Sequence, residues 1–170
     1  MQQLAGIKPL YENSALNELD PKTRNVAAKK ALQKYGASGT ASGKAKALSQ
    51  FKNLMRLPSS LESKAKMFAG QIASSLGLGS DFGYKLGKVS DDSGELVIRF
   101  WVYKGNDITS PIYNLAVYSP NDQRFPEGYT EEAYLMSRGG QVTGSRKTQL
   151  PEDLSRKIVR FVKELQKELE

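Results

Sequence analysis

The chain contains no cysteine and no histidine among its 170 residues. Without cysteine it has no disulfide, no thiolate nucleophile and no zinc site built on cysteine, and this fits a reducing cytoplasm. Without histidine it has no catalytic triad that uses imidazole, no two-histidine metal site and no imidazole general base. Catalysis would depend on carboxylates, lysine, tyrosine or serine. We therefore expect a protein that is not an enzyme and that needs no cofactor.

Long apolar runs are also missing, since none approaches the roughly 20 residues that cross a bilayer. The first residues, Met1 to Ile7, lack the basic segment and the long apolar core of a signal peptide. These features predict a protein of the cytoplasm, or one packaged in a virion, with no membrane partner.

Acidic residues are scarce in one third of the chain. Between Lys22 and Ser80 there are eleven lysines and arginines but a single acid, Glu62, whereas the remainder carries fourteen bases and seventeen acids. An even excess of positive charge would only aid solubility. A segregated cationic segment instead indicates a polyanion or an acidic protein as its partner.

The basic third has the pattern of helices. Asp20 and Pro21 predict a helix start, and the helix is expected to run to Tyr35 and to end with Gly36 in a left-handed cap. Its thin apolar stripe is expected to consist of Val26, Ala27, Ala31 and Tyr35.

Residues 36–43 contain only glycine, alanine, serine and threonine, which predicts a flexible hinge. A second helix is expected over about 44–57. A third is expected to start at a capping box formed by Ser59 and Glu62 and to close at Gly77.

In the rest of the chain, after the third expected helix, apolar and polar residues alternate as they do in β-strands. Residues 82–90, 95–104 and 112–119 predict an antiparallel meander of three strands with a turn at 91–94. Residues 130–132 predict the start of a short helix, with a strand hairpin around Gly139 and Gly140 as the competing interpretation, and 140–149 read as a loop.

Residues 151–169 predict the best helix of the chain, which should cover one face of the sheet. The fold class is therefore α+β, with a basic helical N-terminal half of about three helices, then a three-stranded antiparallel sheet packed by a long C-terminal helix. We expect two parts, a basic helical arm with its hinge over 1–43 and a compact α+β domain over 44–170.

The basic residues are the first candidates for a binding site, because lysine and arginine neutralise phosphates and release counterions from nucleic acid. The candidate phosphate-binding residues are Lys22, Arg24, Lys29, Lys30, Lys34, Lys44, Lys46, Lys52 and Arg56, with Arg146 and Lys147 as a secondary contact. A solvated lysine-rich helix that binds nothing is the simpler alternative.

The strand over 95–104 supplies a second candidate, because alternation puts Arg99, Trp101 and Tyr103 on one face of the sheet. If that face is exposed, its aromatic rings would stack on bases. Tyr84, Tyr113 or Tyr118 would join it, depending on the register. The alternative is that helices cover both faces and Trp101 belongs to a core.

These observations predict a non-enzymatic protein that binds DNA or RNA, mainly at the phosphate backbone, through a basic helical arm. The composition resembles that of basic phage, plasmid and virion proteins. The alternative function is a structural or scaffold protein whose arm docks on another copy of the chain or on an acidic subunit. A third interpretation is a Mg²⁺-dependent nuclease that uses Asp91, Asp92 and Glu95.

Overall fold

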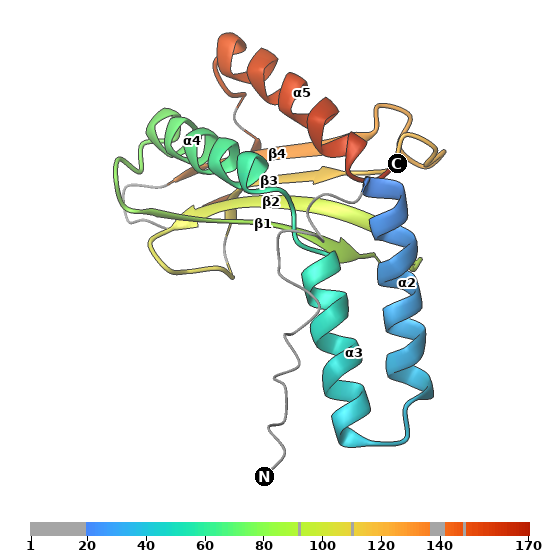
Figure 1. Cartoon of the computed structure of the whole chain (residues 1–170). Helices are drawn as coiled ribbons and strands as arrows, with labels where there is room; N and C mark the ends of the chain where they lie inside the picture. The colour runs from blue at the N-terminus through green and yellow to red at the C-terminus, as the bar shows by residue number, and fades with distance from the viewer. Residues whose placement is uncertain (1–19, 92, 110, 137–141, 148) are drawn as a thin grey trace. The chain divides into compact units, whose positions relative to one another are not determined.

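The computed structural model describes residues 20–91, 93–109, 111–136, 142–147 and 149–170 (Figure 1). Two compact units divide the chain between Arg56 and Leu57. The boundary lies after the second helix, whereas we expected it in a hinge ending at residue 43. The reason is that the first two helices of the described region pack against each other.

The first unit is a hairpin of two antiparallel helices, α2 (Pro21–Ala37) and α3 (Ala41–Leu54) (Figure 1). The predicted start of α2 is confirmed, since Asp20 Oδ1 accepts a hydrogen bond of 3.0 Å from the main-chain N–H of Thr23, and Pro21 occupies the first turn.

The expected hinge over 36–43 is wrong. Gly36 lies within α2, and only residues 38–40 separate the two helices. Thr40 caps α3 by accepting a hydrogen bond of 3.1 Å from the N–H of Gly43, so the helix begins earlier than the expected residue 44. Alanine favours continuation of both helices, and the threonine cap supplies a partner that a flexible linker would lack.

The helix–helix interface is built from small residues. Ala28, Ala31 and Leu54 are buried, with Phe51 and Met55 packed beside them. The expected apolar stripe of α2 is therefore only partly right, because Val26 is 49% exposed and Tyr35 is 38% exposed. The helix α3 packs on the face of α2 that carries alanines, because their small side chains allow the two helices to approach closely.

The second unit contains an antiparallel sheet in the simple order β1-β2-β3-β4-β5. Its strands are β1 (Phe82–Ser90), β2 (Leu96–Lys104), β3 (Pro111–Val117), β4 (Tyr129–Met136) and β5 (Val142–Lys147). The predicted meander of three strands is confirmed and continues for two more. The helix expected from residue 130 is wrong, because the main chain of β4 pairs with β3. The pairing of β4 with β5 agrees with the competing hairpin, although Gly139 and Gly140 themselves lie outside the described residues.

Two helices, α4 (Ser59–Ser75) and α5 (Glu152–Lys167), cover the same face of this sheet (Figure 1). The rings of Phe68 and Phe161, one from each helix, lie 5.1 Å apart over Phe100 of β2. The prediction that the C-terminal helix covers the sheet is confirmed. Among the described residues, no helix combines the length and the apolar character that a membrane crossing requires.

Of the two predictions for the ends of α4, the one for its start is wrong and the one for its end is confirmed. The capping box is wrong, since α4 follows Pro58 without a side-chain cap. The closure at Gly77 is confirmed: this glycine has a φ of +82°, and the N–H of Leu78 reaches back to the carbonyl oxygen of Ala73 at 2.9 Å.

Candidate nucleic-acid interface

The helical hairpin has bases but no acids. Residues 21–56 contain nine lysines and arginines and not one aspartate or glutamate. The exposed members are Lys22, Lys29, Lys30, Lys34, Lys44, Lys46, Lys52 and Arg56. Within the part of the chain that the structure describes, no ion pair joins any of these lysines to a carboxylate. Their charge is therefore not neutralised by the described residues.

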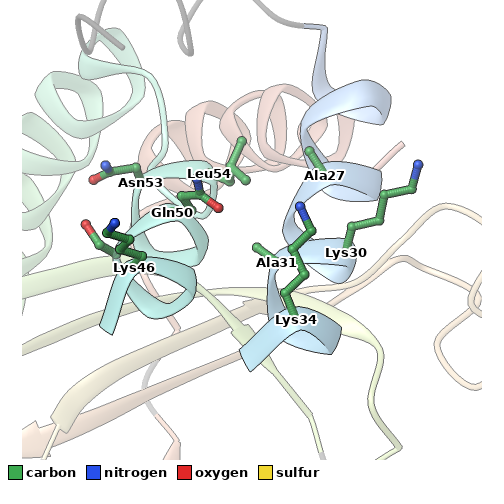
Figure 2. Close-up of a pocket in the computed structure, with 9 residues that line it drawn as sticks. Ala27, Lys30, Ala31, Lys34, Lys46, Gln50, Asn53 and Leu54 are labelled. Carbon is green, nitrogen blue, oxygen red and sulfur yellow. The ribbon is translucent and has the colours of Figure 1, made fainter. Parts of the chain in front are cut away.

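Three of these lysines line one groove of about 530 Å³ between the helices (Figure 2). Lys30 and Lys34 come from α2 and Lys46 comes from α3, while Ala27, Ala31 and Leu54 supply the apolar part of the lining. Ser49, Gln50 and Asn53 complete the α3 side.

The helical repeat explains why these residues meet. On α2 the lining positions are 27, 30, 31 and 34, and on α3 they are 46, 49, 50 and 53, with Leu54 next to the last of them. Both sets follow the i, i+3, i+4, i+7 spacing that puts side chains on one face of a helix. When the two alanine-rich faces pack, these rows lie along one side of the contact.

The groove is rich in hydrogen-bond donors. Each lysine offers an ammonium with three donors and no acceptor, and the amides of Gln50 and Asn53 and the hydroxyl of Ser49 add further donors. Such a set matches an anion with several oxygens, and a phosphate is the common biological example.

Arg24 does not belong to this exposed set. Its side chain is buried, and its Nη1 donates to the main-chain carbonyl oxygen of Arg56 at 3.5 Å. The contact links the start of α2 to the residue that follows α3. We therefore assign Arg24 to the hairpin's structure and no longer count it among the phosphate-binding candidates.

Arg146 and Lys147 lie in β5, whereas we expected them in a loop. The main chain of Lys147 pairs with Tyr134 of β4. Their side chains fall outside the described part, so their role as a secondary contact stays a prediction.

The alternation expected for β2 is confirmed. Ile98, Phe100 and Val102 are buried beneath the helices, whereas Arg99, Trp101 and Tyr103 point to the other face and are half-exposed. We call this other face, as it is formed by β1 to β4, the open face, because α4 and α5 do not cover it.

The register adds residues to the open face that the sequence did not assign to it. Lys85, Asn114 and Glu132 stand in line with Trp101 on the neighbouring strands. Of the three tyrosines considered, Tyr118 lies on this face, and Tyr84 and Tyr113 lie on the helix-covered face. The register of strand pairing decides which face these side chains lie on, and the sequence alone does not reveal that register.

The acids proposed for a nuclease have a structural explanation. The Asp91 carboxylate accepts hydrogen bonds from Ser93, from the N–H of Glu95 and from Arg124, whose Nη2 lies 2.8 Å from Oδ2. The bond from Ser93, followed by Arg124, lowers the pKa of Asp91 to about 2. Asp92 lies outside the described residues, and the residues described contain no group of three side chains suited to hold a metal. Asp91 thus closes the β1–β2 turn.

Comparison with known proteins finds no matching family, no similar curated protein and no solved structure of similar fold.

Proposed function

We propose that this protein binds nucleic acid through its phosphates, with the groove of the α2–α3 hairpin as the main contact. The observation that carries the proposal is the presence of Lys30, Lys34 and Lys46 along one groove of a hairpin that has no acidic residue. A polyanion neutralises such a surface, and release of its counterions supplies affinity.

The shape of the groove supports a chain-like ligand over a small one. It is an open groove lined from two helices, with lysines from both sides and no buried polar side chain among the lining residues. A backbone with regularly repeated phosphates can contact several ammonium groups at once. Contacts of this kind carry little sequence information, so we propose binding with low base specificity.

The test replaces Lys30, Lys34 and Lys46 together by glutamine and measures affinity for a DNA fragment at several salt concentrations. If each lysine neutralises one phosphate, the slope of log K against log salt becomes shallower by about 2 to 3. Affinity at low salt should fall by more than tenfold.

The matched control replaces Lys29, Lys44 and Lys52 by glutamine. This variant loses the same charge from the same two helices, but none of these lysines lines the groove. A smaller loss in the control than in the groove variant supports the groove as the contact. Equal losses would show that only net charge matters, and unchanged affinity in the groove variant would end the proposal.

A further inference from the structure

The open face of the sheet brings together aromatic rings and cations. Across the strands, Lys85 of β1, Trp101 of β2, Asn114 of β3 and Glu132 of β4 form one row in register. The adjacent row contains Arg99 of β2. Tyr103 and Tyr134 lie at one end of the face, two residues beyond Trp101 and Glu132 on their strands.

Among the described residues, apolar packing covers the opposite end of this face. There Val97, Ala116 and Tyr118 are buried, with Val89 and Phe125 packed against them. The rings of Tyr118 and Phe125 stack with their centroids 3.7 Å apart. Trp101 and Tyr103 lie outside this small cluster and are half-exposed among the described residues.

Tyr103 lies flat against the neighbouring strand. A Cβ added at Gly83 would collide with the Tyr103 ring, and the Tyr103 hydroxyl donates to the carbonyl oxygen of Tyr84 at 3.4 Å. The ring is therefore seated against the β1 main chain, and the residue is half-exposed. A ring that is held in place in this way favours stacking of a base, because less motion has to be lost on binding.

One cation lies over the Trp101 ring, and a second lies two residues away on the same strand. Lys85 Nζ lies 5.4 Å from the centroid of the Trp101 ring, and Arg99 is on the same strand and face as Trp101. Gly87, directly opposite Arg99, has nothing within 4 Å of the place where its Cβ would be, which leaves open space on this face at that position. The single acid in the row, Glu132, accepts a hydrogen bond of 2.6 Å from Tyr134.

We infer that the open face binds single-stranded nucleic acid, with unpaired bases stacked on Trp101 and Tyr103 and phosphates held by Lys85 and Arg99. The inference deepens the proposed function and rests on it, since it names the class of nucleic acid. Stacking on an exposed ring needs a base that is free of its partner strand, so paired bases in a duplex cannot make this contact. Lys85 and Arg99, which both neighbour Trp101, then match the phosphate that accompanies a base stacked there.

The test uses a favourable feature of the sequence: Trp101 is the only tryptophan. Its fluorescence therefore reports on the open face without a label. The full-length protein is titrated with an oligothymidylate and, separately, with a blunt-ended DNA duplex of two strands. We expect saturable quenching by the single strand and little change with the duplex.

Affinity measurements on variants complete the test. Trp101→Ala should weaken binding of the oligothymidylate about tenfold or more and leave duplex affinity unchanged. Ile108→Ala is the matched control, because Ile108 is 63% exposed and lies beyond the end of β2, outside the rows of the open face. It should change neither affinity. If Trp101→Ala does not fold, Trp101→Leu retains an apolar side chain but no ring, and it should show the same loss; affinity equal to wild type in this variant would overturn the inference.

The outcomes separate this inference from the proposed function. Unchanged fluorescence on titration with single strands, together with weaker binding by the Lys30, Lys34 and Lys46 variant, would overturn the open face and leave the groove standing. If fluorescence does not change and the lysine variant also binds as wild type does, both the inference and the proposed function are wrong. Quenching by poly-glutamate equal to that by the oligothymidylate would overturn the inference in favour of an acidic polypeptide.

Discussion

Lys88 Nζ lies 2.7 Å from the main-chain carbonyl oxygen of Glu168 and 3.7 Å from its carboxylate, although 80 residues separate the two in sequence. The Lys88 side chain is fully buried. It extends from β1 to the C-terminal end of α5, where main-chain carbonyl groups lack helical partners and a cation is favourable. This contact fixes the end of α5 to the sheet.

Replacing Lys88 by methionine should lower the free energy of unfolding by about 1–3 kcal/mol, because it leaves a buried acceptor without its donor. Urea unfolding measures the difference. Lys64→Met serves as the control, since Lys64 pairs with Glu164 on the surface, where both side chains are half-exposed. Such a pair contributes less than about 1 kcal/mol. Equal losses in the two variants would contradict the role given to Lys88.

The turn between β1 and β2 should respond to acid. The folded pKa of Asp91 is about 2, below its ordinary value of 3.8, so the charged carboxylate stabilises the fold. This stabilisation is complete above about pH 4 and is lost as pH falls toward 2. In Asp91→Asn, urea midpoints should lie below those of wild type at pH 7, and the difference should shrink between pH 4 and pH 2.

Arg124→Met is the control for this prediction. It removes the ion pair with Asp91 but keeps the hydrogen bonds from Ser93 and from the N–H of Glu95. Part of the pH dependence should therefore remain. Identical pH profiles for wild type and Asp91→Asn would show that the turn does not use the Asp91 charge.

Two glycines of β1 provide a matched pair on the open face. A Cβ at Gly83 would overlap the Tyr103 ring and come within 2.7 Å of the Gly105 carbonyl oxygen, whereas a Cβ at Gly87 would meet nothing within 4 Å. Gly83→Ala should destabilise the protein by about 1–3 kcal/mol. Gly87→Ala should leave stability unchanged or raise it by up to about 1 kcal/mol. Thermal unfolding compares the two variants. An equal loss of stability in both would show that the Tyr103 ring is not packed tightly against Gly83.

The second unit should fold without the first. Every buried member of its main core lies between Leu57 and Leu169. A fragment of residues 57–170 should therefore unfold cooperatively in urea and keep the circular dichroism of a mixed α/β protein. It should bind DNA more weakly than the full chain, because it lacks the nine bases of 21–56. A fragment with no cooperative transition would contradict this division.

The sequence predicted the elements that local signals determine. Asp20 and Pro21 set the start of α2, dense β-branched residues defined β2, and the 4-3-4-4 spacing of apolar residues defined α5. It failed at β4, where Thr130, Glu131 and Glu132 have the composition of a helix start. There pairing with β3 decides the structure, and the Tyr113 hydroxyl donates to Glu131 at 2.8 Å.

The sequence predicted which kinds of residue form the candidate site, but it did not predict how they are arranged in space. Charge counting identified the lysines, yet it could not show that Lys30, Lys34 and Lys46 share a groove, because this depends on which faces of α2 and α3 pack. It also could not show that Arg24 is buried. For the open face, alternation placed Trp101 correctly, while the strand register was needed to bring Lys85 beside it.

The absence of carboxylates and imidazoles from residues 21–56 has a consequence for regulation. Mild acidification has no group to protonate in this hairpin, so a change from neutral to endosomal or lysosomal acidity leaves its charge constant. Any ligand that it holds by charge would be released by rising ionic strength or by a competing polyanion, and it would not be released by a fall in pH.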